Sequence, residues 1–190
     1  MKENLFEKER ECLFEYAGIG KCELVVFCLG PLTQSRLPER VSALCGRLRR
    51  GLGISLKLIF CDSPARDIPP EVYKRIIRAA GVREGLYEDD IIFTSDISPR
   101  QDLCERATDM LFSLSDIYIS PCKDDEKNIC RACLHGNLPL FFEGEYDGDF
   151  VKSVHGYTFG EATDFSILLS HIKADSRVGI KKHLRKKSSP

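Results

Sequence analysis

The strongest constraint on the fold is an alternation of short apolar runs with amphipathic stretches. Six runs rich in β-branched and aromatic residues recur along the chain, and five stretches of helical periodicity lie between or after them. Strands that alternate with helices are typical of βαβ units in a parallel sheet. The predicted strands are 23–29, 55–61, 90–94, 116–120, 138–142 and 156–159, and the predicted helices are 37–50, 70–80, 101–112, 128–135 and 164–172.

This pattern predicts an α/β fold, with a Rossmann-like, doubly wound, mainly parallel six-stranded sheet. Runs that are apolar on both faces indicate that helices cover both sides of the sheet. With the strand order 3-2-1-4-5-6, the switch point lies between the first and fourth strands, where ligands bind at the carboxyl ends. The loops concerned are 30–36 and 121–127. The second precedes a helix whose first amides suit a phosphate, and Arg36 in the first loop suits the same ligand.

The charge is unevenly placed. The 190 residues carry a net charge of −1, but the segment from Arg177 to the end holds six Lys and Arg residues and no acid. The rest of the chain is therefore mildly acidic, which argues against nucleic acid as a partner. We predict an N-terminal linker or helix over 1–20, one Rossmann-like domain over 21–175 and a basic, disordered tail over 176–190. The tail is either a solvated end or a polybasic contact with a membrane surface.

The lack of recognisable targeting signals and the cysteine usage predict a reducing compartment. No apolar run approaches the ~18 residues that a membrane span needs, and the charged N-terminus lacks the apolar core of a signal peptide. The nine cysteines are an odd number, and several lie inside apolar runs, where cysteine acts as a small hydrophobe. We therefore predict a cytoplasmic location and no disulfide framework.

Metal and cofactor motifs are weak. Cys130, Cys133 and His135, with Cys122 upstream, have the spacing of a zinc cluster, but they fall within about one and a half turns of a predicted helix. Zinc-binding Cys-x-x-Cys pairs usually lie on a turn with a second pair elsewhere. Buried or reactive thiols are the favoured interpretation. The chain lacks GxGxxG after the first strand and also lacks GxxxxGK[ST], which argues against NAD and P-loop sites.

Four blocks of the sequence, in order, resemble the C-terminal, donor-binding half of GT-B-fold retaining glycosyltransferases of the E-x7-E type, also called glycosyltransferase group 1. The resemblance runs from about Lys8 to about Ile172, which is most of the chain. The blocks correspond to the first strand with its phosphate loop, the second strand, the third to fourth strands, and the E-x7-E segment. The blocks read ELVVFCLGPLTQSRL, SLKLIFCDSP, DIIFTSDISPRQDLCERATDMLFSLSDIYISPC and DDEKNICRACLHGNLPLFF.

The resemblance implies a donor site with a degenerate motif. The first motif glutamate, which contacts the donor sugar, falls on Asp124, the implied catalytic residue. The second, which holds the ribose, falls on Ala132, so this carboxylate is missing. One of the two cations of the first loop is kept as Arg36. The implied donor- and nucleotide-binding residues are Gly30, Arg36, Asp96, Lys127, Asn128 and Ile129.

The activity implied by the resemblance is sugar transfer from a nucleoside diphosphate sugar, with no metal cofactor. Only one of the two GT-B halves is recognisable, so transfer is expected only with a partner subunit that carries the acceptor domain. Two alternatives stay open: an inactive relative that serves as a binding or scaffold protein, and an unrelated α/β nucleotide-binding enzyme. For Asp124, capping of the following helix is the simpler role. Ala132→Glu is expected to improve nucleotide affinity if the position faces the cleft.

Overall fold

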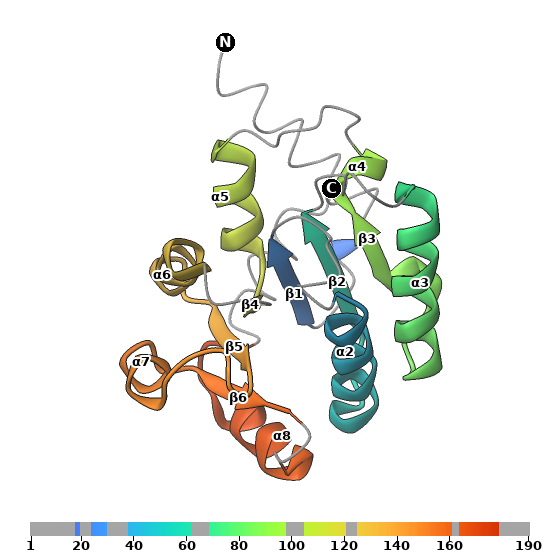
Figure 1. Ribbon diagram of the computed structural model, residues 1–190. Coiled ribbons are helices and arrows are strands. Elements are labelled where there is room, and N and C mark those ends of the chain that lie inside the picture. Colours follow the sequence, from blue (N-terminus) through green and yellow to red (C-terminus); the bar gives the residue numbers. More distant parts are fainter. Residues whose placement is uncertain are drawn as a thin grey trace.

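A computed structural model shows one open sheet of six parallel strands (Figure 1). It describes residues 18–19, 24–29, 38–61, 69–97, 105–120, 125–160 and 164–178. The strand order is β3-β2-β1-β4-β5-β6, as predicted. Each strand lies within one residue of its predicted bounds, because each apolar run has turn-forming or polar residues at its ends. The strands are β1 (Leu24–Leu29), β2 (Leu56–Cys61), β3 (Ile91–Phe93), β4 (Ile117–Ser120), β5 (Leu138–Phe142) and β6 (Tyr157–Phe159).

The five predicted helices are present. Predicted residues 37 and 101–104 lie outside the described residues, and the other described helix ends lie within three residues of the predicted ones. Three short elements were missed, namely η3 (Glu88–Asp90), α4 (Thr94–Ile97) and α7 (Gly148–Ser153), because three to six residues are too few to show a periodic apolar face. In α7 the helix start is instead marked by Asp147, whose Oδ1 accepts hydrogen bonds from the amides of Asp149 and Phe150. The elements are α2 (Pro38–Leu52), α3 (Pro70–Arg83), η3 (Glu88–Asp90), α4 (Thr94–Ile97), α5 (Glu105–Leu114), α6 (Glu126–Leu134), α7 (Gly148–Ser153) and α8 (Phe165–Ala174).

Helices cover both faces of the sheet, as the unbroken apolar strands predicted (Figure 1). Alternate residues of β1 point to opposite sides. Leu24 and Val26 join a core formed with α2, α3 and α8, and Val25 and Phe27 join a core formed with α5, α6 and α7. The two cores fix the sheet between two helical layers, so the strand ends are left to form loops and sites.

A buried aspartate ties β4 to β1, the two strands that create the switch point. Asp116 precedes β4 and is fully buried. Its Oδ2 accepts a hydrogen bond from the Val25 amide at 2.8 Å, and its own amide donates to the Val25 carbonyl at 2.9 Å. The two bonds satisfy both backbone groups of Val25 and help to fix the register Val26↔Ile117.

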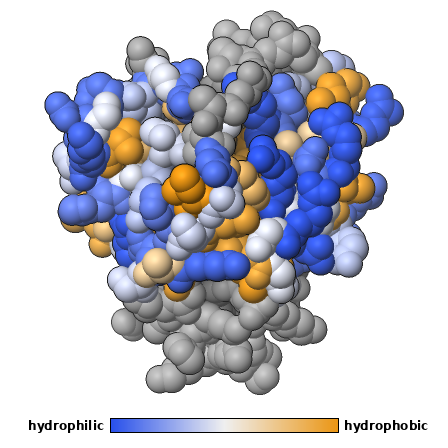
Figure 2. All heavy atoms as spheres, turned by 90° about the horizontal axis from the view of Figure 1, so that it is seen from below, coloured by the Kyte–Doolittle hydropathy of each residue, from blue (hydrophilic) through white to orange (hydrophobic). Residues whose placement is uncertain are grey.

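The last described residue, Val178, packs against the domain. It lies three residues past the predicted tail boundary at 175, and its contacts are with the core beside α8. The three predicted domain boundaries themselves stay predictions. Among the described residues, every helix is too short or too polar to cross a membrane. Seen from below, at the amino end of the strands, several hydrophobic side chains lie near the middle of the face, among many hydrophilic ones (Figure 2).

Candidate functional site at the switch point

The sheet reverses its winding direction between β1 and β4. From β1 the chain builds β2 and β3 on one side, and from β4 it builds β5 and β6 on the other. The carboxyl ends of both strands, at Leu29 and Ser120, lie at the same edge of the sheet. Ligands of open α/β sheets bind at this position. The predicted residues Gly30, Arg36 and Asp124 follow these strand ends and lie outside the described residues.

A buried polar group, which we call the Asp125 cluster, lies where β4 leads into α6. It consists of Tyr118, Asp125 and Asn128. The Tyr118 hydroxyl donates to Asp125 Oδ2, and Asn128 Nδ2 donates to Asp125 Oδ1 at 2.6 Å. Tyr118 is fully buried and Asp125 is only 2% exposed. The carboxylate therefore joins the end of a central strand to the first turn of the helix that faces the switch point.

Burial and charge keep the Tyr118 hydroxyl protonated. Burial is the main cause that raises the pKa of Tyr118 well above its usual value, and the charge of Asp125 raises it further. Although Asp125 stands at the helix start, its side chain makes no capping hydrogen bond to the first turn of α6. Its charge still lies at the positive end of the helix dipole, which favours it. The cluster therefore orients α6 through side chains rather than through the helix amides.

A second polar contact lies beside the cluster. Ser120, the last residue of β4, has its hydroxyl 3.1 Å from the hydroxyl of Tyr146, whose ring stacks on Phe150 at 5.2 Å. Tyr118, Asp125 and Tyr146 were not among the predicted donor-site residues. The signal for Tyr118 was present, because a tyrosine in a buried strand needs a partner for its hydroxyl.

The predicted residues of α6 lie on different faces of the helix. Lys127 is exposed, and Asn128 is partly buried in the Asp125 cluster. Ile129 and Ala132 are fully buried in the core between α6 and the sheet. Ile129 can thus offer a ligand only its backbone. The predicted gain in nucleotide affinity from Ala132→Glu required a side chain that faces the cleft. In this structure the side chain of Ala132 is buried in the core instead.

Asp96 lies in a separate network at the β3 edge. Its carboxylate binds Lys74 Nζ through Oδ1 and Arg78 Nη2 through Oδ2, the latter at 3.0 Å. Both cations also lie over the ring of Phe93, at 5.4 and 5.0 Å from its centroid. Two strands, β2 and β1, separate β3 from β4. The structure therefore does not bring Asp96 together with Asn128, and it gives Asp96 two cationic partners on α3.

Of the four residues of the alternative zinc cluster, Cys122 lies outside the described residues, and Cys130, Cys133 and His135 lie in or at the end of α6. His135 stacks on Phe112, and its Nε2 lies 3.2 Å from Asp109 Oδ1, which also accepts a hydrogen bond from Arg131 Nε at 2.6 Å. Hydrogen bonding from Arg131 is the main cause that lowers the pKa of Asp109. Cys130 is exposed and Cys133 is partly buried, both as free thiols. Within the described residues, no group of three or more His, Cys, Asp or Glu side chains could hold a metal ion.

Comparison with known proteins rests on structure. No protein-family model and no curated protein matches the chain. A structure described as trehalose-6-phosphate from E. coli bound with UDP-2-fluoro glucose is similar with a TM-score of 0.57 and 13% identity, over 93% of this chain and 43% of that chain. An α,α-trehalose-phosphate synthase (UDP-forming) from Burkholderia vietnamiensis gives 0.55 and 13%, over 94% and 45%. The chain thus spans less than half the length of these two proteins.

A third similar structure is itself a single domain. It is the C-terminal domain of a glycosyl transferase group 1 family protein, LpcC, from Francisella tularensis. Its TM-score is 0.54 at 14% identity, over 87% of this chain and 83% of that chain. At such identities the likeness concerns the fold. The chain therefore has the Rossmann-like α/β fold of one half of a GT-B glycosyltransferase. The predicted resemblance to the C-terminal half is confirmed at this level, and the roles of Asp124 and Ala132 stay predictions.

Proposed function

We propose that this chain is the donor-binding half of a GT-B glycosyltransferase and binds a nucleoside diphosphate sugar at the β1–β4 switch point. The observation that carries the proposal is the place of α6, whose N-terminus follows β4 at the carboxyl edge of the sheet. Helix N-termini favour phosphate because their first amides lack partners and the dipole is positive there. Similarity in fold to a structure bound with UDP-2-fluoro glucose supports a nucleotide sugar as ligand.

In the proposed reaction, the bond between the sugar and the diphosphate breaks and a bond to an acceptor hydroxyl forms. The diphosphate leaves with the bonding electrons and takes up the proton that the acceptor hydroxyl releases. The first amides of α6, around Lys127 and Asn128, and the Arg36 guanidinium stabilise the charge that develops on the leaving diphosphate. Asp124 contacts the sugar. The Asp125 cluster holds the helix start in place. This chemistry needs no metal ion.

Transfer also needs an acceptor-binding half. The chain matches 43% and 45% of the two trehalose-related structures, but 83% of the isolated C-terminal domain. We propose that a partner subunit supplies the acceptor half and completes the cleft. A cytoplasmic location and a membrane-surface contact of the basic tail belong to the same proposal.

A second candidate function is favoured by Ala132. A carboxylate that holds the ribose is absent at this position, and the side chain packs in the core. Loss of charged hydrogen bonds of this kind lowers affinity by about 1.5–3 kcal/mol. A chain without them could keep the fold for contact with a partner and bind no donor. This scaffold function and the donor-binding function differ in one measurable property, nucleotide affinity.

Calorimetric titration with UDP, GDP and their sugars tests the proposal. A Kd below about 100 μM, which corresponds to about 5.5 kcal/mol of binding free energy, supports a donor site. Arg36→Ala is then expected to weaken binding by about 1.5–3 kcal/mol, because a charged hydrogen bond to diphosphate is lost. Arg83→Ala is the matched control, since this arginine is 76% exposed on α3. No binding across the panel, or equal effects of both variants, would favour the scaffold function.

A further inference from the structure

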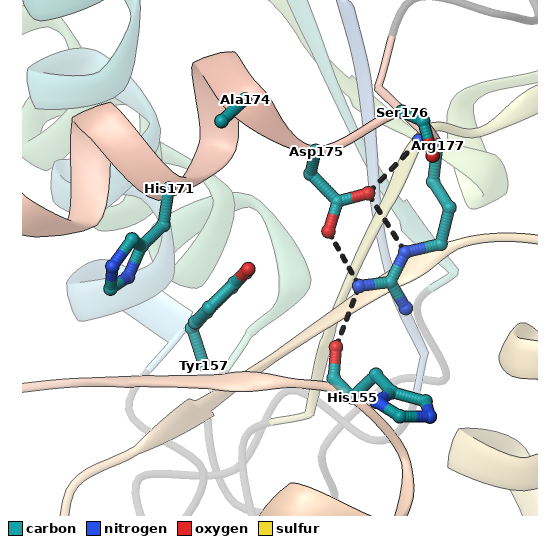
Figure 3. A pocket seen from close by; sticks show the side chains of 7 residues that line it. All are labelled: His155, Tyr157, His171, Ala174, Asp175, Ser176 and Arg177. Atoms are coloured by element: carbon teal, nitrogen blue, oxygen red, sulfur yellow. Dashed lines mark hydrogen bonds and ion pairs between the residues drawn. The ribbon is translucent and has the colours of Figure 1, made fainter.

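An open pocket of about 480 Å³ lies at the amino end of the sheet, away from the switch point. It is formed where the turn before β6 meets the end of α8 (Figure 3). In a parallel sheet the strands start at one edge and end at the other, so this pocket and the proposed donor site lie at opposite edges. The residues that line it are His155, Tyr157, His171, Ala174, Asp175, Ser176 and Arg177.

The guanidinium of Arg177 is held in one orientation by two partners. Its Nε donates to Asp175 Oδ1 at 2.9 Å, and its Nη2 donates to Asp175 Oδ2 and to the His155 carbonyl, each at 2.6 Å (Figure 3). This pairing offsets the charge of Asp175 and lowers the pKa of its carboxyl. Among the described residues, the other terminal nitrogen, Nη1, has no hydrogen-bond partner. A fixed guanidinium with one free edge is a ready donor to an anion.

Aromatic side chains form a second wall. The rings of Tyr157 and His171 stack with centroids 4.9 Å apart and planes inclined by 25°. The Tyr157 hydroxyl points toward Asp175 and Arg177 (Figure 3) and has no hydrogen bond to a described residue. His171 is exposed on α8. The wall thus offers ring faces for an apolar part of a ligand, and hydroxyl and imidazole groups for a polar part.

His155 occupies a backbone position that usually belongs to glycine. Its φ is 50°, the one positive value outside glycine among the described residues. The turn is a helix end of Schellman type, in which the His155 amide donates to the Lys152 carbonyl and the Gly156 amide donates to the Val151 carbonyl, both at 3.0 Å. A non-glycine residue costs about 1–2 kcal/mol in this conformation. The chain therefore keeps an imidazole at the pocket despite the strain.

The hydrogen-bonding groups of the pocket suit an anion. Arg177 offsets the charge of Asp175, so Arg177 Nη1, the Tyr157 hydroxyl and the two imidazoles remain as groups that can donate to a ligand. We propose that the pocket binds a phosphate monoester: Arg177, Tyr157 and the imidazoles donate to its oxygens, and the Tyr157 and His171 rings contact the carbon chain that carries it.

Titration of the full chain with inorganic phosphate and glycerol 3-phosphate tests the proposal, with amide NMR shifts as the readout and sodium chloride to match ionic strength. We expect saturable shifts at Tyr157, His171 and Arg177. Tyr157→Phe and His171→Ala should each weaken binding about tenfold, the loss expected for one hydrogen bond to a charged ligand. Lys173→Ala is the control, because it removes a full charge from the same helix outside the pocket.

Two results would overturn the proposal. One is the absence of phosphate-specific shifts at the pocket up to millimolar phosphate. The other is a loss in Lys173→Ala as large as in Tyr157→Phe, because this would reduce the binding to general charge attraction. A urea unfolding curve for each variant separates lost binding from lost folding. The titration contains no nucleotide, so its outcome is independent of the donor site.

Vesicle sedimentation then distinguishes two sources of the same chemistry. Vesicles of phosphatidic acid in phosphatidylcholine present a lipid phosphate monoester, and vesicles of phosphatidylcholine alone present none. Sedimentation that Tyr157→Phe reduces and glycerol 3-phosphate competes away identifies a lipid headgroup. Binding of glycerol 3-phosphate without sedimentation identifies a soluble ligand. Sedimentation unchanged in both pocket variants, together with no soluble binding, contradicts the proposal.

Discussion

The two ends of the sheet each hold an aspartate among aromatic side chains, but they use it differently. At the carboxyl end, Asp125 is 2% exposed and accepts hydrogen bonds from the neutral groups of Tyr118 and Asn128. At the amino end, Asp175 lines an open pocket and is paired with a cation, Arg177. A carboxylate among neutral donors fixes the backbone around it, whereas a carboxylate paired with a cation beside an open pocket fixes the direction of its partner. The first arrangement positions a helix, and the second presents donors to solvent.

Because of this contrast, substitutions at the carboxyl end should mainly change the stability of the fold, and substitutions at the amino end should mainly change ligand binding. When one member of a buried hydrogen-bonded cluster is removed, its partners are left without a hydrogen bond, because water cannot enter to replace it. At an open pocket, water can reach the groups that face it, so the loss of one partner costs less. Substitutions at the two ends should therefore separate folding from binding.

The largest effect is expected for Ala132→Glu on α6. Ala132 is fully buried in the core between α6 and the sheet. A carboxylate at this position would be buried without a partner, so we expect a loss of about 3–5 kcal/mol in unfolding free energy. Cys130→Glu is the matched control, because Cys130 is exposed on the same helix and should change stability by less than about 0.5 kcal/mol. Urea unfolding measures both.

A different result for Ala132→Glu would change the donor site. A stable variant with improved nucleotide affinity would show that the side chain enters the cleft, as the E-x7-E pattern implies. The buried packing would then be wrong at this turn of α6.

The next largest effect is expected for Asp125→Ala. The hydroxyl of Tyr118, which is fully buried, would lose its acceptor, and Asn128 would lose its partner, so we expect about 2–4 kcal/mol of destabilisation. Asp147→Ala is the control. This exposed aspartate caps α7, and its loss should cost about 1 kcal/mol. Equal losses in the two variants would show that the Asp125 cluster acts only as a surface cap.

The sequence predicted the strands well because each is a continuous apolar run between polar or turn-forming residues. The order of the strands followed from the general rule for doubly wound sheets. The face of α6 was also readable: Ile129, Ala132 and Cys133 have the i, i+3, i+4 spacing of a buried stripe. The resemblance to the E-x7-E motif assigned Ala132 to the cleft instead.

The amino-end pocket was not predictable in the same way. Its residues come from a turn, a strand and the end of a helix, and only the packing of β6 against α8 brings them together. Arg177 begins a run rich in Lys and Arg, so its charge was assigned to the tail. A charge run gives no sign that one of its members has a fixed partner, because local sequence does not show a contact such as that of Arg177 with the His155 carbonyl.

A smaller effect is expected for Arg177→Ala, measured as stability against pH. The pKa of Asp175 is lowered in the folded protein, mainly by the hydrogen bond from Arg177. Asp175 therefore contributes stability above its unfolded pKa, near 3.9, and the contribution is lost as pH falls through the lower folded pKa. Arg177→Ala should lose about 1 kcal/mol at neutral pH, a value reduced by solvent screening, and should lose less on acidification than the parent.

Urea unfolding between pH 6 and pH 2 checks this prediction at the acid end of the range. Arg83→Ala serves as the control, because Arg83 is 76% exposed and should leave the pH profile unchanged. Parallel profiles for Arg177→Ala and the parent would show that the pair contributes nothing to stability. The guanidinium of Arg177 would then not be held in place for a ligand.

The smallest effect is expected for His155→Gly, and it should have opposite signs for stability and binding. Glycine adopts the φ of 50° without strain, but it loses more chain entropy on folding, so the expected net gain is about 0.5–1 kcal/mol. The phosphate pocket should bind more weakly, because one imidazole is gone. His155→Ala also lacks the imidazole but keeps the strain, so it should bind as weakly as the glycine variant while being less stable. Urea midpoints and phosphate titrations of the three proteins measure both quantities. If glycine lowers stability or leaves phosphate affinity unchanged, His155 is not kept at this turn for the pocket.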